Sequence, residues 1–276
     1  MDVYRADAND DFEPSRRTLK FEGAEREYFV ALPRSFDPGE TYWPLVFVHG
    51  GGGNARRNRK GMAIRKIADE LGLPAVVILP RFITEDKQLS RFPLLGEGAF
   101  LREVLGDVCS EFSLHGKMLL GGYSMGGQFS HRFAFFNPDM VQACASLAAG
   151  TWSTPAGRLL IEGYGEVEDP GSFLTDRENA GRVPGRLRDL FDTRTAEVAA
   201  LPAADGAEKV PFLVMCGTLD PRLSIARGFA SRLRESGFEV ETEWPRTPHS
   251  SDYERYRSGY DRYPRHAVHF FKKHTG

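Results

Sequence analysis

The sequence has few cysteines, no apolar run long enough to cross a membrane, and almost no excess of either charge. Its three cysteines, Cys109, Cys144 and Cys216, lie in apolar stretches without the spacing of metal ligands. They are predicted to be reduced core thiols of a cytosolic protein. The net charge of −2 gives no electrostatic reason to bind nucleic acid or an anionic membrane. The polar N-terminus does not have the pattern of a secretory signal, so we expect a cytoplasmic protein.

Short apolar runs alternate with helix-length segments from residue 44 onward, in a chain of 276 residues expected to form a single domain, 1–276. The runs are Leu45–Val48, Ala75–Leu79, Met118–Leu120, Val141–Leu147 and Pro211–Cys216. Strands that are apolar on both faces and separated by helices indicate a parallel sheet that is covered on both sides. A hairpin (Arg17–Phe21 with Arg26–Leu32) precedes them, and Phe238–Trp244, with a glutamate at every second position, is predicted as an edge strand. The sequence thus predicts an α/β fold with a mostly parallel sheet of about eight strands.

Helices are predicted between these strands. They cover Asn54–Leu71, Glu97–Phe112, a segment after residue 124 with Phe129, Phe133 and Phe136 on its core face, Leu223–Ser236, and the C-terminus. Residues 151–209 interrupt the alternation and are predicted to be an insertion that forms a lid or pocket wall, with a helix near Pro184–Ala200. Trp152 opens this insertion. It is a candidate wall of a substrate pocket, with core packing as the alternative.

The segment Gly122-Tyr-Ser-Met-Gly-Gly127 directly follows a short apolar strand and precedes a helix. A serine with glycine two residues away on each side, at a strand-to-helix turn, is typical of a nucleophile elbow. Side chains at the two glycine positions would collide across the turn, which gives Gly122 and Gly126 a steric reason to be glycine. The pattern predicts Ser124 as a catalytic nucleophile.

A glycine-rich turn, His49 to Asn54, follows the strand Leu45–Val48. Acyl transfer creates a negative oxygen in its tetrahedral intermediate, and backbone N–H groups without a neighbouring Cβ can approach that oxygen closely. We therefore predict an oxyanion hole formed by Gly51, Gly52 and the N–H of Met125, the residue after the nucleophile. His49 is interpreted as a residue that braces the loop.

The acid and the base of a serine-hydrolase triad are predicted at the ends of two late strands. Asp220 lies in the loop after Pro211–Cys216, where it also suits the start of the following helix. His249 lies in the loop after the edge strand, whereas His131 is too far along its helix to reach back to Ser124. The order Ser124, Asp220, His249 is the order expected for α/β-hydrolases.

The same glycine turn allows a second interpretation. Gly50, Gly52 and Ala55 have the spacing of a dinucleotide-binding fingerprint, and Arg81 after the next strand suits the phosphate of NADP. An NADP-dependent oxidoreductase is therefore a remote alternative. This alternative does not explain the serine elbow around Ser124.

Taken together, these motifs resemble those of the esterase and depolymerase branch of the α/β-hydrolases, which includes feruloyl-esterase-like and polyhydroxybutyrate-depolymerase-like proteins. The resemblance rests on Arg26–Pro33, Pro44–Asn54, Gly122–Gly127, Cys216–Pro221 and Thr247–Ser250. It covers residues 17–150 and 208–275. It implies an α/β-hydrolase fold and a Ser-His-Asp triad, and it leaves residues 151–209 unassigned.

The resulting hypothesis is a serine hydrolase that cleaves a small-molecule carboxylic ester through an acyl-enzyme. It requires no metal and no organic cofactor. An acyltransferase, a thioesterase or a peptidase with the same triad, and a non-catalytic binding protein of the same fold, remain alternatives.

Overall fold

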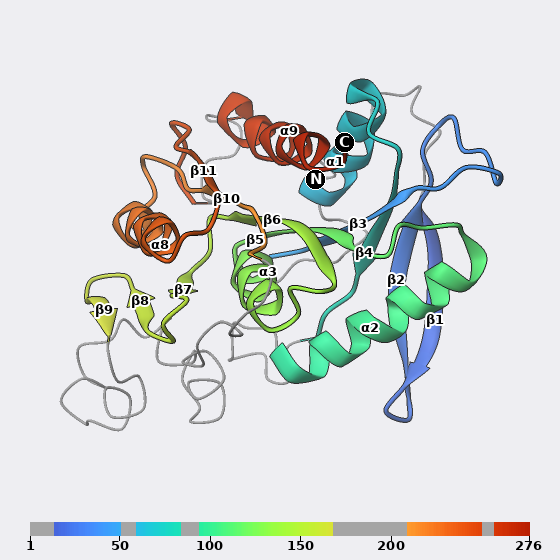
Figure 1. Cartoon of the computed structure of the whole chain (residues 1–276), viewed down its shortest axis with the longest axis horizontal. Helices are drawn as coiled ribbons and strands as arrows, with labels where there is room; N and C mark the ends of the chain where they lie inside the picture. Colours follow the sequence, from blue (N-terminus) through green and yellow to red (C-terminus); the bar gives the residue numbers. More distant parts are fainter. Residues whose placement is uncertain (1–13, 51–58, 84–93, 168–208, 250–256) are drawn as a thin grey trace, which may run out of the picture.

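The computed structural model describes residues 14–50, 59–83, 94–167, 209–249 and 257–276. Eight strands form one sheet in the order β1-β2-β4-β3-β5-β6-β10-β11 (Figure 1). They are β1 (Ser15–Phe21), β2 (Ala24–Ala31), β3 (Trp43–Val48), β4 (Ala75–Pro80), β5 (Met118–Tyr123), β6 (Val141–Leu147), β10 (Phe212–Met215) and β11 (Val240–Glu243). The β1–β2 hairpin pairs antiparallel with β4, and all other pairings are parallel. The predicted sheet and its N-terminal hairpin are confirmed.

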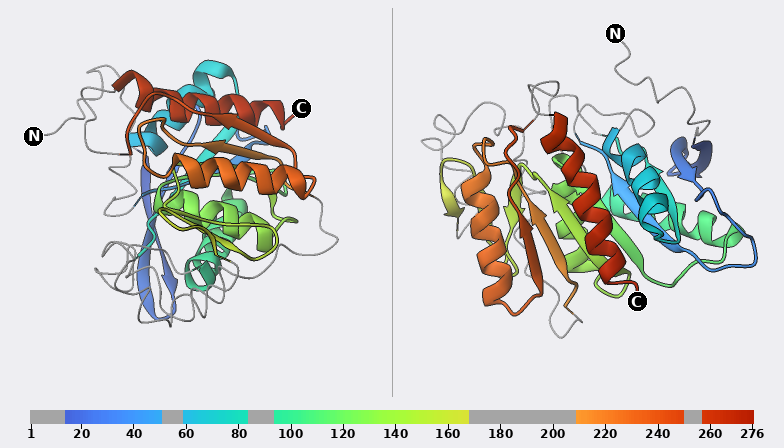
Figure 2. Two further views of the ribbon diagram at one scale, coloured as in Figure 1. Left: turned by 90° about the vertical axis from the view of Figure 1, so that its left-hand side faces the viewer. Right: turned by 90° about the horizontal axis from the view of Figure 1, so that it is seen from above.

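Helices cover both faces of this sheet, as predicted (Figures 1 and 2). Helices α1 (Arg59–Leu71) and α9 (Arg257–Lys273) lie on one face, and α2 (Leu94–Glu111), α3 (Met125–Phe136) and α8 (Leu223–Glu235) lie on the other. Residues 54–58 of the first predicted helix and the helix predicted near 184–200 lie outside the described residues. None of the described helices is long and apolar enough to span a membrane.

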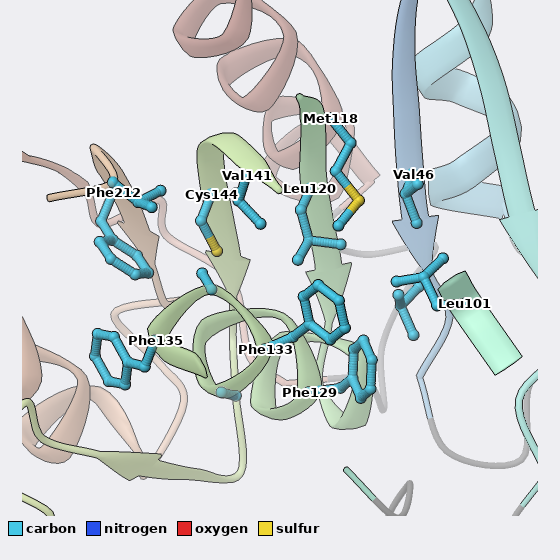
Figure 3. Close-up of a cluster of buried hydrophobic side chains, with 14 of the residues drawn as sticks. Val46, Leu101, Met118, Leu120, Phe129, Phe133, Phe135, Val141, Cys144 and Phe212 are labelled. Atoms are coloured by element: carbon cyan, nitrogen blue, oxygen red, sulfur yellow. The ribbon is translucent and has the colours of Figure 1, made fainter. Parts of the chain in front are cut away.

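The core consists of two apolar clusters, one on each face of the sheet, because the inner strands are buried on both sides. Every residue of β4 and β5 is buried. Figure 3 shows the cluster between the sheet and α3, where Phe133 points toward Leu120 of β5, Phe129 stacks beside Phe133, and Phe135 points toward Phe212 of β10. Of the predicted aromatic stripe, Phe136 is only partly buried, and Phe135 takes its place in the core. The reason is that α3 also packs toward α8, where the ring of Phe135 meets Phe229.

The parallel strands are in a register that brings their carboxyl ends to one edge of the sheet. Val48 pairs with Gly122, Tyr123 pairs with Leu147, and Met215 pairs with both Leu147 and Glu243. The loops that follow β3, β5, β10 and β11 therefore start at nearly the same level. In an open α/β sheet this edge is where ligands bind.

A second sheet follows β6. It is antiparallel and contains β7 (Thr151–Ser153), β8 (Leu159–Ile161) and β9 (Gly165–Val167). All three strands contact α8, and Figure 1 places them at one end of the molecule. They form the described part of the predicted insertion, 151–209. Residues 168–208 lie outside the described residues, so a lid or pocket wall stays a prediction.

The cysteines are free, and two of them, Cys144 and Cys216, are buried as predicted. The prediction was wrong for Cys109, which is exposed on α2. Val104 and Val108 form the buried face of this helix. Cys109 directly follows Val108, so its side chain is rotated by about 100° around the axis of α2 and points away from the sheet.

Candidate active site

Ser124 occupies a strained turn between β5 and α3. Its φ of 57° and ψ of −113° lie in a region that residues other than glycine rarely adopt. Two hydrogen bonds hold the turn: the Ser124 N–H donates to Leu147 O at 2.8 Å, and the Gln128 N–H donates to Ser124 O at 3.0 Å. Ser124 is partly exposed, although its neighbours Tyr123 and Met125 are buried. This is the geometry predicted for a nucleophile elbow.

The two elbow glycines are required by close backbone contacts. A Cβ on Gly122 would lie 2.3 Å from the backbone of Gly126, as the motif predicted. A Cβ on Gly126 would instead lie 2.1 Å from Val48 O of the neighbouring strand β3. The second glycine therefore lets α3 approach the sheet closely, so that the first turn of this helix lies directly beside the end of β3.

The three predicted triad residues lie in hydrogen-bonding contact. Ser124 Oγ is 3.0 Å from His249 Nε2, and His249 Nδ1 is 2.7 Å from Asp220 Oδ2. The Asp220 side chain has no exposed surface, whereas one fifth of the His249 side chain is exposed. The serine comes from the end of β5, the acid from the loop after β10, and the base from the loop after β11. A carboxylate that accepts from Nδ1–H leaves Nε2 unprotonated and able to accept the serine proton.

Asp220 has a lowered pKa despite its burial. Burial by itself raises the pKa of this carboxyl, but the hydrogen bond and charge of His249, together with the N–H and guanidinium of Arg222, outweigh it. The Arg222 N–H donates to Asp220 Oδ1 at 3.0 Å. Arg222, not Asp220, is the N-cap residue of α8. Even so, the carboxylate both holds the start of this helix and contacts the histidine, because each oxygen has its own partner.

The loop that carries the base, residues 245–249, lies directly on the loop that carries the acid. Thr218 N donates to Pro245 O at 2.8 Å, and Leu219 N donates to Thr247 O at 3.3 Å. A Cβ on Gly217 would lie 1.8 Å from Thr247 O. Glycine at position 217 therefore allows the close approach of the two loops. Sequence analysis did not identify this glycine, although its place directly after a buried strand is a usable signal.

The predicted oxyanion hole is described only in part. Met125 is the first residue of α3, where backbone N–H groups have no partner within the helix. Gly51 and Gly52 lie outside the described residues, so their role stays a prediction. Gly50, directly before them, lies against the elbow: a Cβ there would be 3.3 Å from Tyr123 O and 3.4 Å from Ser124 Cβ. The glycine turn thus starts beside the nucleophile.

Two buried histidines near the elbow act as structural braces. His49 Nδ1–H donates to Gly50 O at 2.8 Å, and His49 Nε2 accepts from Phe82 N at 3.2 Å. These bonds connect the loops after β3 and β4, which is the bracing role predicted for His49. His131 bridges Gly127 O and Ser153 N at 2.8 and 3.0 Å. Burial lowers the pKa of both histidines.

Trp152 is fully buried in the core. Its ring stacks on Phe229 of α8 with a centroid separation of 4.6 Å, and it lies 5.3 Å from the ring of His131. The interpretation of Trp152 as a pocket wall is therefore corrected to core packing. Its place depends on the docking of α8 against β7, which the local sequence around Trp152 does not encode.

Candidate metal ligands occur at the other end of the sheet. In the described part of the chain, Glu239, Glu241 and His274 have ligand atoms within 4.8 Å of one another. Glu239 precedes β11, whereas His249 follows this strand. The group therefore lies at the amino end of β11, and the triad lies at its carboxyl end. Glu241 also pairs with Lys273. None of these residues contributes to the site around Ser124.

The structure gives no support to the dinucleotide alternative. Arg81, which that alternative needs for the cofactor phosphate, forms an ion pair with Glu27 of the hairpin. Gly52 and Ala55 lie outside the described residues.

Comparison with solved structures identifies the fold. The chain is similar to a ferulic acid esterase (TM-score 0.64, 18% identity, covering 94% of this chain and 99% of that one). It is also similar to an esterase from the archaeon Pyrobaculum calidifontis (TM-score 0.68, 18% identity, 96% and 87% covered). A third similar structure is an S-formylglutathione hydrolase from Staphylococcus aureus (TM-score 0.60, 18% identity, 93% and 98% covered). No protein-family model matches the sequence, and no curated protein matches it.

The chain has the α/β-hydrolase fold, and the expected fold class is confirmed. Its structural neighbours are esterases and hydrolases of the α/β-hydrolase type. At 18% identity, these similarities establish the fold and do not establish the substrate or the reaction. The chemistry of the site depends on the side chains of this chain.

Proposed function

We propose that the chain is a serine hydrolase that cleaves carboxylic esters through a covalent acyl-enzyme. The observation that carries this proposal is the continuous hydrogen-bonded path from Ser124 Oγ through the His249 ring to the Asp220 carboxylate, with distances of 3.0 and 2.7 Å. A strained, partly exposed serine, an imidazole whose Nε2 faces the serine hydroxyl and a buried carboxylate are the components of a nucleophile with its general base.

In the first half of the reaction, Ser124 Oγ attacks the ester carbonyl carbon while His249 Nε2 takes the hydroxyl proton. The carbonyl electron pair moves onto oxygen, and the N–H of Met125 with those of Gly51 and Gly52 stabilise this oxyanion. When the tetrahedral intermediate collapses, the alcohol oxygen leaves with the proton from His249. Asp220 stays ionised, fixes the ring tautomer and stabilises the imidazolium.

In the second half, water gives a proton to His249 Nε2 and attacks the acyl carbon. When the second tetrahedral intermediate collapses, its bond to Ser124 Oγ breaks, His249 Nε2 returns the proton to Oγ, and the acid is released. The sequence of steps balances without a metal or an organic cofactor. The partner is a small-molecule ester.

Two neighbours are named as esterases, which supports ester hydrolysis as the first activity to test. A third neighbour is named for S-formylglutathione, a thioester, which is the reason to include thioesters. Acyl transfer to an added alcohol, and peptide hydrolysis, are the remaining alternatives with the same triad.

The test is a panel of p-nitrophenyl and aryl esters of increasing acyl length, with CoA thioesters and an alcohol acceptor in parallel. Ser124→Ala should lower kcat on the best ester at least about 10⁴-fold without changing the thermal midpoint by more than a few degrees. Ser110→Ala is the matched control, because this exposed serine lies on α2 and its hydroxyl donates to Asp107 O of the same helix. Ester turnover that persists in purified Ser124→Ala would refute the proposal.

A non-catalytic binding protein of the same fold is distinguished by the same variants. A protein that binds an ester without turnover would show saturable binding and no released alcohol, with or without the serine hydroxyl.

A further inference from the structure

Tyr123 is the last residue of β5 and directly precedes Ser124. Its hydroxyl donates a hydrogen bond to the backbone carbonyl oxygen of His249, a residue 126 positions further along the chain. The Tyr123 ring also stacks on the His249 ring, with centroids 5.6 Å apart and an angle of 21° between the planes. One side chain thus contacts both the backbone and the imidazole of the proposed base.

The Tyr123 ring is itself held in place by packing. Only 8% of Tyr123 is exposed, and Tyr263 of α9 meets its ring edge-to-face at 5.7 Å. A buried ring with a fixed backbone has few rotamers available. The hydroxyl therefore occupies a defined position relative to β5.

The base loop, residues 245–249, contacts both the acid loop and Tyr123. The acid loop donates to the carbonyls of Pro245 and Thr247. At His249 itself, the backbone carbonyl accepts from the Tyr123 hydroxyl. The acid loop thus holds the backbone of residues 245–247 and, through Asp220, the His249 ring, and Tyr123 holds the backbone of His249.

From this arrangement we propose that Tyr123 is a positioning residue that sets the place of His249 relative to the Ser124 hydroxyl. This inference rests on the proposed serine-hydrolase function. Because Tyr123 and Ser124 are adjacent in the chain, a shift of the elbow moves the anchor of the base by the same amount. The position of the His249 ring relative to the Ser124 hydroxyl is thereby tied directly to the elbow, in addition to its contact with Asp220.

A positioning role for Tyr123 predicts that kcat and KM respond differently to the loss of its hydroxyl. Misplacing a general base lowers the rate of the chemical step, whereas substrate contacts are left intact. Tyr123→Phe keeps the ring stack and the contact with Tyr263, and removes only the hydroxyl. We expect kcat to fall about fivefold to tenfold, the equivalent of one hydrogen bond, with KM changed less than about twofold.

Tyr28→Phe is the matched control. Tyr28 is also buried, its hydroxyl donates to Asp107, and β2 is separated from β5 by β4 and β3. This variant also loses a tyrosine hydroxyl hydrogen bond, here to a carboxylate, at a distance from the triad. We expect its thermal midpoint to fall at least as much as that of Tyr123→Phe, while its kcat stays at the wild-type value.

The experiment measures kcat and KM on the best ester of the panel for the full-length wild type, Tyr123→Phe, Tyr28→Phe and Ser124→Ala. Rates of the variants that keep Ser124 are divided by the active-site concentration from fluorophosphonate titration, so that unfolded molecules are not counted, and the rate of Ser124→Ala is divided by its protein concentration. A wild-type kcat in Tyr123→Phe, or an equal loss in Tyr28→Phe, would overturn the inference while the proposed function stands. Turnover that is unchanged in Ser124→Ala would instead overturn the function, and the inference with it.

Discussion

Asp220 uses its two carboxylate oxygens for different partners: Oδ1 accepts from the N–H of Arg222, and Oδ2 accepts from His249. Both carboxylate oxygens are thus held by hydrogen bonds. Replacement by asparagine keeps the shape of the side chain but can present an N–H to His249, which favours the wrong ring tautomer. We expect Asp220→Asn to lower kcat about 10⁴-fold with little change in KM.

The lowered pKa of Asp220 also predicts how the variant behaves in acid. A carboxyl whose pKa is lower in the folded than in the unfolded protein stabilises the fold above its ordinary pKa of 3.8. That contribution disappears as the pH falls through the folded-state value. The difference in unfolding free energy between wild type and Asp220→Asn, measured with urea, should therefore shrink as the pH falls below about 4. A difference that is independent of pH would contradict the assigned charge state.

At the level of strands and loops, the site depends on the contact between the acid loop and the base loop. Gly217 allows this contact, because any Cβ there would overlap Thr247 O. Gly217→Ala must push residues 245–249 away from β10. We expect kcat to fall about 10²-fold, since a misplacement of about 1 Å has that effect.

Gly106→Ala is the matched control for Gly217→Ala. Gly106 lies within α2, and a Cβ there would meet nothing within 4 Å. Alanine is the better helix former by about 1 kcal/mol, so this variant should be slightly more stable than wild type and equally active. If Gly217→Ala were as active as Gly106→Ala, the close packing of the two loops would not matter for the reaction.

The strands and the order of the triad could be predicted because each signal is local. The apolar runs define the inner strands, Ser124 directly follows one strand, and Asp220 and His249 lie in the loops after two later strands. The contacts that complete the site are not local. Tyr123 meets His249 across 126 residues, and Trp152 reaches the core only because α8 docks on β7. Such contacts depend on the register and packing of the whole sheet, which no single segment encodes.

At the scale of the whole molecule, buried neutral histidines make stability depend on pH. His131 has no exposed surface, and burial and the neighbouring Arg132 hold its pKa well below the ordinary value of 6.5 despite the hydrogen bond to Gly127. The unfolded chain takes up this proton at its ordinary pKa, and the folded chain does not. The free energy of unfolding should therefore fall as the pH drops below about 6.5, by up to about 1.4 kcal/mol per pH unit for this residue.

His131→Gln should flatten this dependence between about pH 5 and pH 7, measured by urea unfolding. His269→Gln, at an exposed position of α9, should leave it unchanged. An equal slope in wild type and His131→Gln would show that the proton uptake lies elsewhere.

The central claim, that Ser124 is an activated nucleophile, is tested most directly by covalent labelling. A fluorophosphonate reacts with an activated serine hydroxyl, forms a phosphorus–oxygen bond and releases fluoride. Intact-mass and peptide analysis of the treated protein should find one adduct per chain, on the peptide that contains Ser124, and none in Ser124→Ala. An adduct on a different residue, or a wild-type protein that stays unlabelled under conditions that label a control serine esterase, would contradict the account.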